Sequence, residues 1–132
     1  MNSNTHAVFC SNNETLKFID LETGNTEILT GHTDIIITID KFKNFIVTGS
    51  KDNECRLWHY SPDAPEFNKI KCVAVFKGHT MNISCVNFSP KKGYQFVSSS
   101  EDNTIKVWNV KQLMHKINEK DDSEETEIEI IN

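Results

Sequence analysis

Two sets of side chains in this sequence contain the residue types of a hydrolytic triad. The first set consists of His32, Asp52 and a hydroxyl from Thr48 or Ser50. A histidine that is oriented by a carboxylate can activate a hydroxyl as a nucleophile, so such a set could cleave an ester or amide bond. However, neither hydroxyl lies in a Gly-x-Ser-x-Gly segment, the sharp turn that exposes the nucleophile of many hydrolases.

The second set repeats the first at a nearly constant spacing. The Gly-His pairs that contain His32 and His79 are 47 residues apart, and Trp58 and Trp108 are 50 residues apart. A catalytic site is normally needed once, whereas an architectural feature recurs in every copy, so the pattern favours a structural role and we expect no enzyme. The recurring residues are His32, Thr48, Ser50, Asp52, Trp58, His79, Ser98, Ser100, Asp102 and Trp108.

The repeat divides the chain into an incomplete unit, 6–29, and two longer units, 31–76 and 78–110. In the incomplete unit Asn13 stands at the aspartate position and Ile19 replaces the tryptophan. Short β-prone runs bounded by Gly, Asn, Asp, Ser and Pro fill each unit, and this pattern is typical of strands joined by turns. A period in the forties predicts propeller blades of four antiparallel strands. We therefore expect an all-β partial propeller of about two and a half blades.

The combination of a Gly-His pair, a Ser-x-Ser-x-Asp-like turn and a strand-ending tryptophan resembles the signature of the WD-repeat family. The second long unit is a close match, whereas in the first Trp58 is followed by His59 instead of aspartate. The resemblance implies a buried network in each blade. In it the indole N–H bonds the strand hydroxyl, the hydroxyl meets the histidine, and the aspartate accepts from the other ring nitrogen and from turn amides.

A closer resemblance runs from Leu16 to about Leu113. It is carried by Leu-Lys-Phe-Ile-Asp-Leu-Glu-Thr-Gly, Glu-Ile-Leu-Thr-Gly-His-Thr-Asp-Ile, Lys-Asp-Asn with Arg-Leu-Trp, and Lys-Cys-Val-Ala-Val-Phe-Lys-Gly-His-Thr. The order of these segments is similar to the opening of the second propeller in transducin beta-like (Utp-type) WD-repeat subunits of the ribosomal small-subunit processome.

This resemblance implies a scaffold of the nucleus and nucleolus that acts in pre-ribosomal RNA processing and small ribosomal subunit biogenesis. Its partners would be other protein subunits of a large ribonucleoprotein particle, with indirect association with small nucleolar RNA and pre-ribosomal RNA. One alternative is a different WD-repeat adaptor, such as a ubiquitin-ligase receptor or a trafficking subunit. A hydrolase that uses a His/Ser/Asp site is a more distant alternative.

Composition and charge exclude several other classes of function. The net charge is −5, and seven acidic residues and one lysine lie between Glu119 and Glu129, so the rest of the chain is nearly neutral. With Arg56 as its one arginine, the chain lacks the basic surface and the arginine forks of a nucleic-acid reader. Its four cysteines form no Cys-x-x-Cys pair, so we expect buried or half-buried free thiols in strands and no metal or cofactor. We also expect no membrane contact and no small-molecule substrate.

Exposed loops at one rim are where a propeller binds its partners. The candidate partner-binding residues follow the Gly-His pairs or lie in the neighbouring turns. They are Thr33, Asp34, Lys51, Thr80, Met81, Asn82 and Glu101.

The number of units also carries an expectation about stability. A propeller normally closes with four to eight blades. Residues 1–113 supply fewer, so we expect a fragment with open sheet faces that is not a stable monomer in isolation. Residues 114–132 are predicted to form an acidic, flexible tail or inter-repeat loop, in which Ser123 and Thr126 are candidate phosphorylation sites.

Overall fold

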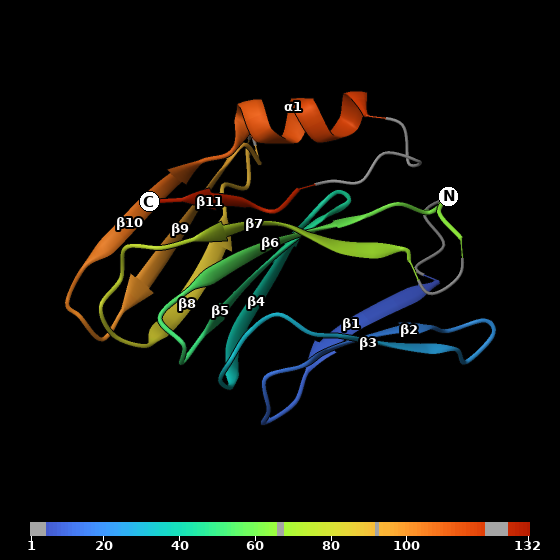
Figure 1. Ribbon diagram of the computed structural model, residues 1–132, viewed down its shortest axis with the longest axis horizontal. Helices are drawn as coiled ribbons and strands as arrows, with labels where there is room; N and C mark the ends of the chain where they lie inside the picture. The colour runs from blue at the N-terminus through green and yellow to red at the C-terminus, as the bar shows by residue number, and fades with distance from the viewer. Residues whose placement is uncertain (1–4, 66–67, 92, 121–126) are drawn as a thin grey trace.

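The computed structural model describes residues 5–65, 68–91, 93–120 and 127–132 as three β-sheets and one helix (Figure 1). The strands are β1 His6–Cys10, β2 Leu16–Asp20, β3 Thr26–Leu29, β4 Ile36–Phe42, β5 Phe45–Ser50, β6 Cys55–Tyr60, β7 Ile70–Phe76, β8 Ile83–Phe88, β9 Gln95–Ser100, β10 Ile105–Asn109 and β11 Glu129–Ile131; the helix is α1 Lys111–Glu119.

Each sheet corresponds to one unit of the repeat. Strands β1–β3 form blade 1, β4–β7 form blade 2 and β8–β10 form blade 3, and consecutive strands within each blade pair antiparallel. The predicted all-β partial propeller is therefore confirmed. Blade 2 contains all four strands of a propeller blade, and β11 adds a fifth, parallel strand at its outer edge.

The turns between the second and third strands of the two long units have the same backbone conformation. Asn53 has φ of 70° and Asn103 has φ of 66°. Asparagine tolerates this left-handed region better than most residues, and in both turns it follows the aspartate of the repeat. The conformation brings the aspartate side chain back over its own turn, where Oδ1 accepts the N–H of Glu54 in one turn and of Thr104 in the other, at 2.9 and 2.8 Å.

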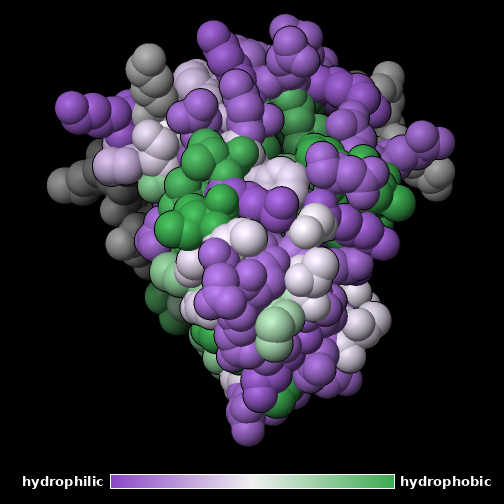
Figure 2. Space-filling model, turned by 90° about the vertical axis from the view of Figure 1, so that its left-hand side faces the viewer, coloured by the Kyte–Doolittle hydropathy of each residue, from purple (hydrophilic) through white to green (hydrophobic). Residues whose placement is uncertain are grey.

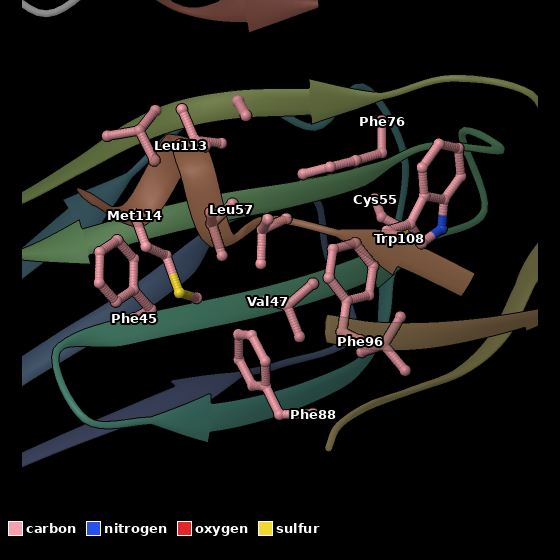
Figure 3. Packing of buried hydrophobic residues seen from close by; sticks show 14 of the residues in the cluster. Phe45, Val47, Cys55, Leu57, Phe76, Phe88, Phe96, Trp108, Leu113 and Met114 are labelled. Carbon is pink, nitrogen blue, oxygen red and sulfur yellow. The ribbon is translucent and has the colours of Figure 1, made fainter. Parts of the chain in front are cut away.

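Two apolar clusters hold the blades together. The smaller one lies between blades 1 and 2 and contains Leu16, Phe18, Leu29, Ile36, Ile46, Trp58 and Ile70. The larger one lies between blades 2 and 3, and Figure 3 shows Met114 and Leu113 of α1 among its aromatic and aliphatic side chains. Because blade 2 buries one sheet face against blade 1 and the other against blade 3, the burial of apolar area joins the units into one structure.

Polar side chains of β4 in blade 2 accept hydrogen bonds from the backbone of β8 in blade 3. The Val86 backbone N–H donates to Thr38 Oγ1 at 3.3 Å, and the Phe88 N–H donates to Asp40 Oδ2 at 2.6 Å. These two bonds satisfy amides along the free edge of β8 and fix the register between the two inner strands. The sequence alone did not reveal them.

Gly49 is a point of close approach between the same two blades. A Cβ atom built there would overlap the Ile83 side chain and lie 2.9 Å from Thr38 Cγ2. We predict that Gly49→Ala lowers the free energy of unfolding by roughly 1–3 kcal/mol, because the added methyl group must push β8 away. Ser99 occupies the equivalent position in blade 3, so Ser99→Ala is the matched control and should change stability by less than about 0.5 kcal/mol. Equal urea midpoints for the two variants would contradict this account of the contact.

Two described segments after blade 3 form regular structure where the sequence predicted a flexible tail or inter-repeat loop. The predicted boundary between residues 113 and 114 falls inside α1, whose Leu113, Met114 and Ile117 are buried. Beyond it, β11 pairs with β7. Both elements form because the blade 2–blade 3 cluster and the edge of β7 supply apolar and hydrogen-bonding partners that an acidic segment lacks alone. Ser123 and Thr126 lie outside the described residues.

Both outer blades leave a sheet face open. On blade 3, Val97, Ile105 and Val107 are 41%, 75% and 63% exposed, and on blade 1 Phe9 and Ile28 are 39% and 59% exposed. Figure 2 shows green apolar side chains between hydrophilic ones on the side of the molecule where β10 lies. These are the open faces that the repeat count predicted, and apolar side chains on them favour packing against a further sheet.

The four cysteines are free and lie in strands, but the expectation that all are buried or half-buried was wrong for one. Cys55 is buried, Cys10 and Cys72 are half-buried, and Cys85 is exposed on β8. Cys85 faces solvent because it lies beside the bulge between Ile83 and itself, on the face of β8 that points away from the cluster. Burial raises the pKa of the Cys55 thiol to about 12, so this thiol stays protonated and is a poor nucleophile.

Candidate functional site

The first repeated set forms one continuous hydrogen-bond network in blade 2. His32 Nδ1 lies 2.6 Å from Asp52 Oδ2, and His32 Nε2 lies 2.7 Å from Thr48 Oγ1. The Trp58 indole N–H donates to the same hydroxyl at 2.9 Å. Asp52 Oδ2 also accepts the backbone N–H of Thr33 at 3.1 Å. The network therefore joins the loop before β4, the β5–β6 turn, and strands β5 and β6.

Blade 3 contains the same network with serine as the central hydroxyl. His79 Nδ1 lies 2.8 Å from Asp102 Oδ2, His79 Nε2 lies 2.8 Å from Ser98 Oγ, and the Trp108 N–H donates to that hydroxyl at 2.9 Å. The Thr80 N–H donates to Asp102 at 3.1 Å, the distance seen for the equivalent bond in blade 2. Two copies with matching geometry indicate a repeated structural device.

The donors and acceptors assign the proton positions. A carboxylate can only accept, so Nδ1 of each histidine carries the hydrogen that points to Asp52 or Asp102. In the neutral form of the ring Nε2 is then an acceptor, and the Thr48 or Ser98 hydroxyl donates to it while accepting from the indole. Every polar atom at the centre of each network has a partner, which is the condition for a stable buried polar group.

Burial separates these networks from a hydrolytic site. Thr48 and Ser98 are both 0% exposed. The side chains of His32 and His79 are 0% and 1% exposed. A nucleophile must reach its substrate, and each hydroxyl already donates and accepts within the network. The arrangement can hold strands and loops in place, but it offers no reacting atom to a substrate.

Hydrogen bonds favour the ionised form of both aspartates. Burial opposes ionisation of Asp52, but bonds from His32 and from the amides of Glu54 and Thr33 outweigh it, so the pKa of Asp52 is lowered. For Asp102 the Thr104 hydroxyl is the largest cause, and together with His79 and two amides it holds the pKa well below its usual range. The charged carboxylates of Asp52 and Asp102 thus accept hydrogen bonds from the loop amides and hold the loops in position.

We predict that the fold loses stability in acid because of these two carboxylates. Their pKa values in the folded chain lie below the unfolded value of about 3.9, so their contribution is fully present above about pH 4 and is lost as the pH falls through the folded values. Urea unfolding of the full-length protein at a series of pH values between about 2 and 6 measures this loss of stability. In Asp102→Asn, the free energy of unfolding should fall less steeply as the pH is lowered. An unchanged pH dependence in this variant would contradict the role given to the Asp102 carboxylate.

The incomplete unit keeps the turn and loses the network. Asn13 Oδ1 accepts the Thr15 N–H at 3.0 Å, as the aspartate does in the other two turns. Phe9, which pairs with Lys17 in β2, stands where the strand hydroxyl stands elsewhere, and Ile19 replaces the tryptophan. Ser11 lies at the start of the same turn. Blade 1 therefore depends on its apolar cluster instead of a buried polar network.

The candidate rim residues lie in loops that the buried networks hold. Ser50 Oγ donates to the Asp34 carbonyl at 2.9 Å, and Ser100 Oγ donates to the Met81 carbonyl at 3.0 Å. Backbone hydrogen bonds join the neighbouring turns to the same loops. The Lys51 N–H donates to the Ile35 carbonyl at 2.9 Å, and the Glu101 N–H donates to the Asn82 carbonyl at 3.0 Å. The side chains of Thr33, Asp34, Lys51, Thr80, Met81 and Glu101 are exposed and that of Asn82 is half-buried.

One member of the blade 3 network was missed in the sequence. Thr104 Oγ1 lies 2.5 Å from Asp102 Oδ1 and 3.1 Å from His79 Nδ1. Thr15 and Glu54 occupy the equivalent positions two residues after the turn asparagine or aspartate, and each donates its N–H to that side chain. This recurrent spacing was a signal in the sequence, although the residue type differs between units.

Other kinds of site are not seen in the part of the chain that the structure covers. Within the described ranges, no three or more His, Cys, Asp or Glu side chains gather in a way that could hold a metal ion. The described helix, α1, is too short to cross a membrane.

Comparison with known proteins agrees with this geometry. The sequence profile of the family described as "WD domain, G-beta repeat" matches residues 24–59 and 70–109, which include both networks. The chain belongs to the WD-repeat family. Proteins of this family are generally scaffolds without enzymatic activity.

Several relatives share part of this WD-repeat chain. Transducin beta-like protein 3 of Bos taurus is 34% identical over 106 residues, which cover 79% of this chain and 13% of that protein. Ribosome biogenesis protein WDR12 homolog of Drosophila erecta is 33% identical over 89 residues, or 64% of this chain and 20% of that protein. GID complex subunit 7 of Schizosaccharomyces pombe is 32% identical over 71 residues, or 54% of this chain and 13% of that protein. The chain thus spans a small part of these relatives.

Proposed function

We propose that this chain is part of a protein-interaction scaffold of the small-subunit processome, which acts in the nucleolus in pre-ribosomal RNA processing and small ribosomal subunit biogenesis. The observation that carries the proposal is the similarity to Transducin beta-like protein 3 over 79% of the chain. A second relative is named as a ribosome biogenesis protein. Its partners would be protein subunits of the particle, and its association with small nucleolar RNA and pre-ribosomal RNA would be indirect.

The buried networks support a binding role because they fix the loops that would meet a partner. Thr80 and Met81 follow His79 directly, and their backbone groups bond Asp102 and Ser100. A loop whose backbone is already ordered loses less conformational entropy on binding. We therefore propose that Thr33, Asp34, Lys51, Thr80, Met81, Asn82 and Glu101 form the partner-binding rim.

Met81 is the apolar residue of this rim and is 49% exposed. We predict that Met81→Asp weakens partner binding at least about tenfold, because a charge replaces an apolar anchor at the interface. Its effect on unfolding should stay within about 0.5 kcal/mol, since the contacts of the loop are made by backbone atoms. Capture of partner proteins by the full-length product measures binding, with Met81→Leu as the matched control. Equal capture by Met81→Asp and Met81→Leu would exclude Met81 from the binding surface.

Sedimentation of the tagged full-length protein in a sucrose gradient tests the proposed particle. The protein should sediment with large pre-ribosomal particles, together with small nucleolar RNA, and digestion of RNA should shift it to lighter fractions. The similarity to GID complex subunit 7 favours an adaptor role in another assembly as the second candidate. Sedimentation that RNA digestion leaves unchanged would support this second candidate and oppose the first.

A further inference from the structure

Strand β11 pairs with the outer edge of β7, although blade 2 already has its four strands. One edge of β7 pairs with β6 across the sheet. On its other edge, Glu129–Ile131 pair with Ala74–Phe76 in a parallel register, and the Lys77 N–H donates to the Ile131 carbonyl at 2.7 Å. All strand pairs inside the blades are antiparallel, so β11 is an addition to the edge of a complete four-stranded blade.

Among the described residues, no strand pairs with Ile70–Val73 on this edge of β7. β7 extends over Ile70–Phe76, and β11 covers its last three residues. An uncovered strand edge presents backbone N–H and C=O groups to which another extended chain can bond. Adding a strand to such an edge is a common mode of peptide recognition, in which the backbone supplies affinity and alternate side chains supply specificity.

The side chains of β11 show which peptide the edge accepts. Ile131 is partly buried against the blade 2–blade 3 cluster, whereas Ile130 is 63% exposed. On the same strand, Glu129 Oε1 lies 2.5 Å from Lys116 Nζ of α1. The edge therefore accepts a strand with an isoleucine that packs against the apolar cluster. Two positions before this isoleucine, the strand carries a glutamate that pairs with a lysine.

We propose that the outer edge of β7 is a binding site for an extended segment of a partner protein in which glutamate and isoleucine alternate, and that β11 occupies this site in the free chain. The pairing of β11 is short: three paired residues, the Lys77–Ile131 backbone bond, the partly buried Ile131 side chain and one exposed ion pair hold it. A partner segment that makes the same contacts and also pairs along Ile70–Val73 can therefore displace it. The proposal is independent of the processome role, since it rests on the edge of blade 2 and not on the rim.

Binding of a labelled peptide with the sequence of residues 127–132 tests the proposal, measured by fluorescence anisotropy with the full-length protein that contains this chain. In the unchanged chain the tethered strand competes at an effective concentration on the order of millimolar, so binding of the free peptide should be weak. Ile131→Asp should release the tethered strand and tighten peptide binding at least about tenfold. Ile130→Asp, a change at the exposed neighbour, is the matched control and should leave peptide binding weak.

Substitutions at the edge itself show where the peptide binds. In the Ile131→Asp chain, Lys77→Pro removes the N–H that bonds β11, whereas Lys77→Ala keeps it; both lose the 3.3 Å ion pair with Glu54. Peptide binding should be lost with proline and kept with alanine. Equal binding by these two variants would overturn the proposal, as would a dimer of the unchanged chain that Ile131→Asp dissociates, since a second copy would then be the occupant.

Hydrogen exchange of the unsubstituted protein tests the proposal without any variant, and therefore also if the variants do not fold. The amides of residues 129–131 should exchange faster as the peptide is added, while the Lys77 amide stays protected by the new strand. Exchange at residues 129–131 that does not respond to saturating peptide would overturn the proposal.

Discussion

Replacing Ser98 with alanine is expected to lower the free energy of unfolding by roughly 2–6 kcal/mol, because two buried groups lose their partner at once. The Trp108 indole N–H and His79 Nε2 both bond this hydroxyl, at 2.9 and 2.8 Å. Both groups are buried, since the His79 side chain is 1% exposed and Trp108 is 8% exposed, and Ser98 itself is 0% exposed. Urea unfolding of the full-length protein, followed by circular dichroism, measures the loss.

The repeat itself supplies the matched control for this substitution. Thr48 performs the role of Ser98 in the blade 2 network. Ser98→Thr should therefore keep both bonds and change stability by less than about 1 kcal/mol, apart from fitting one methyl group. If Ser98→Ala were as stable as Ser98→Thr, the hydroxyl would not be holding the blade together.

Replacing Trp58 with alanine is expected to cost roughly 3–5 kcal/mol, the range for removing a large aromatic side chain from a core. Trp58 is 2% exposed and lies in the cluster between blades 1 and 2. It does not contribute to the larger cluster between blades 2 and 3. The damage should therefore be local, with faster hydrogen exchange in β1–β3 and little change in β8–β10.

Trp58→Phe separates the two contributions of this residue. Phenylalanine keeps most of the apolar contact and removes the N–H that donates to Thr48 at 2.9 Å. We expect a cost of about 1–2 kcal/mol, well below that of alanine. Equal costs for the two variants, or uniform acceleration of exchange across all three blades, would contradict the separation of the two clusters.

The sequence predicted the blades well because their determinants are local. Alternation of apolar residues and turn residues such as Asn53 and Asn103 acts over a few neighbours, and the repeat showed which copies correspond. The histidines, hydroxyls, aspartates and tryptophans could be named for the same reason, although their bonds follow from the family resemblance.

What the sequence did not reveal depends on contacts between elements. Asp40 bonds the Phe88 amide only because β4 and β8 lie side by side. The helix α1 has buried Leu113, Met114 and Ile117, a pattern too short to be recognised among its charged neighbours. The position of β11 is set by the free edge of β7, which is distant in the sequence. None of these features follows from local propensity.

Affinity purification of the full-length protein under native conditions tests whether it belongs to the small-subunit processome, with the bound RNA sequenced and the bound proteins identified by mass spectrometry. If it does, a small nucleolar RNA and subunits of the small-subunit processome should be enriched together. Enrichment of a complete, unrelated protein assembly without ribosomal RNA precursors or small nucleolar RNA would contradict it.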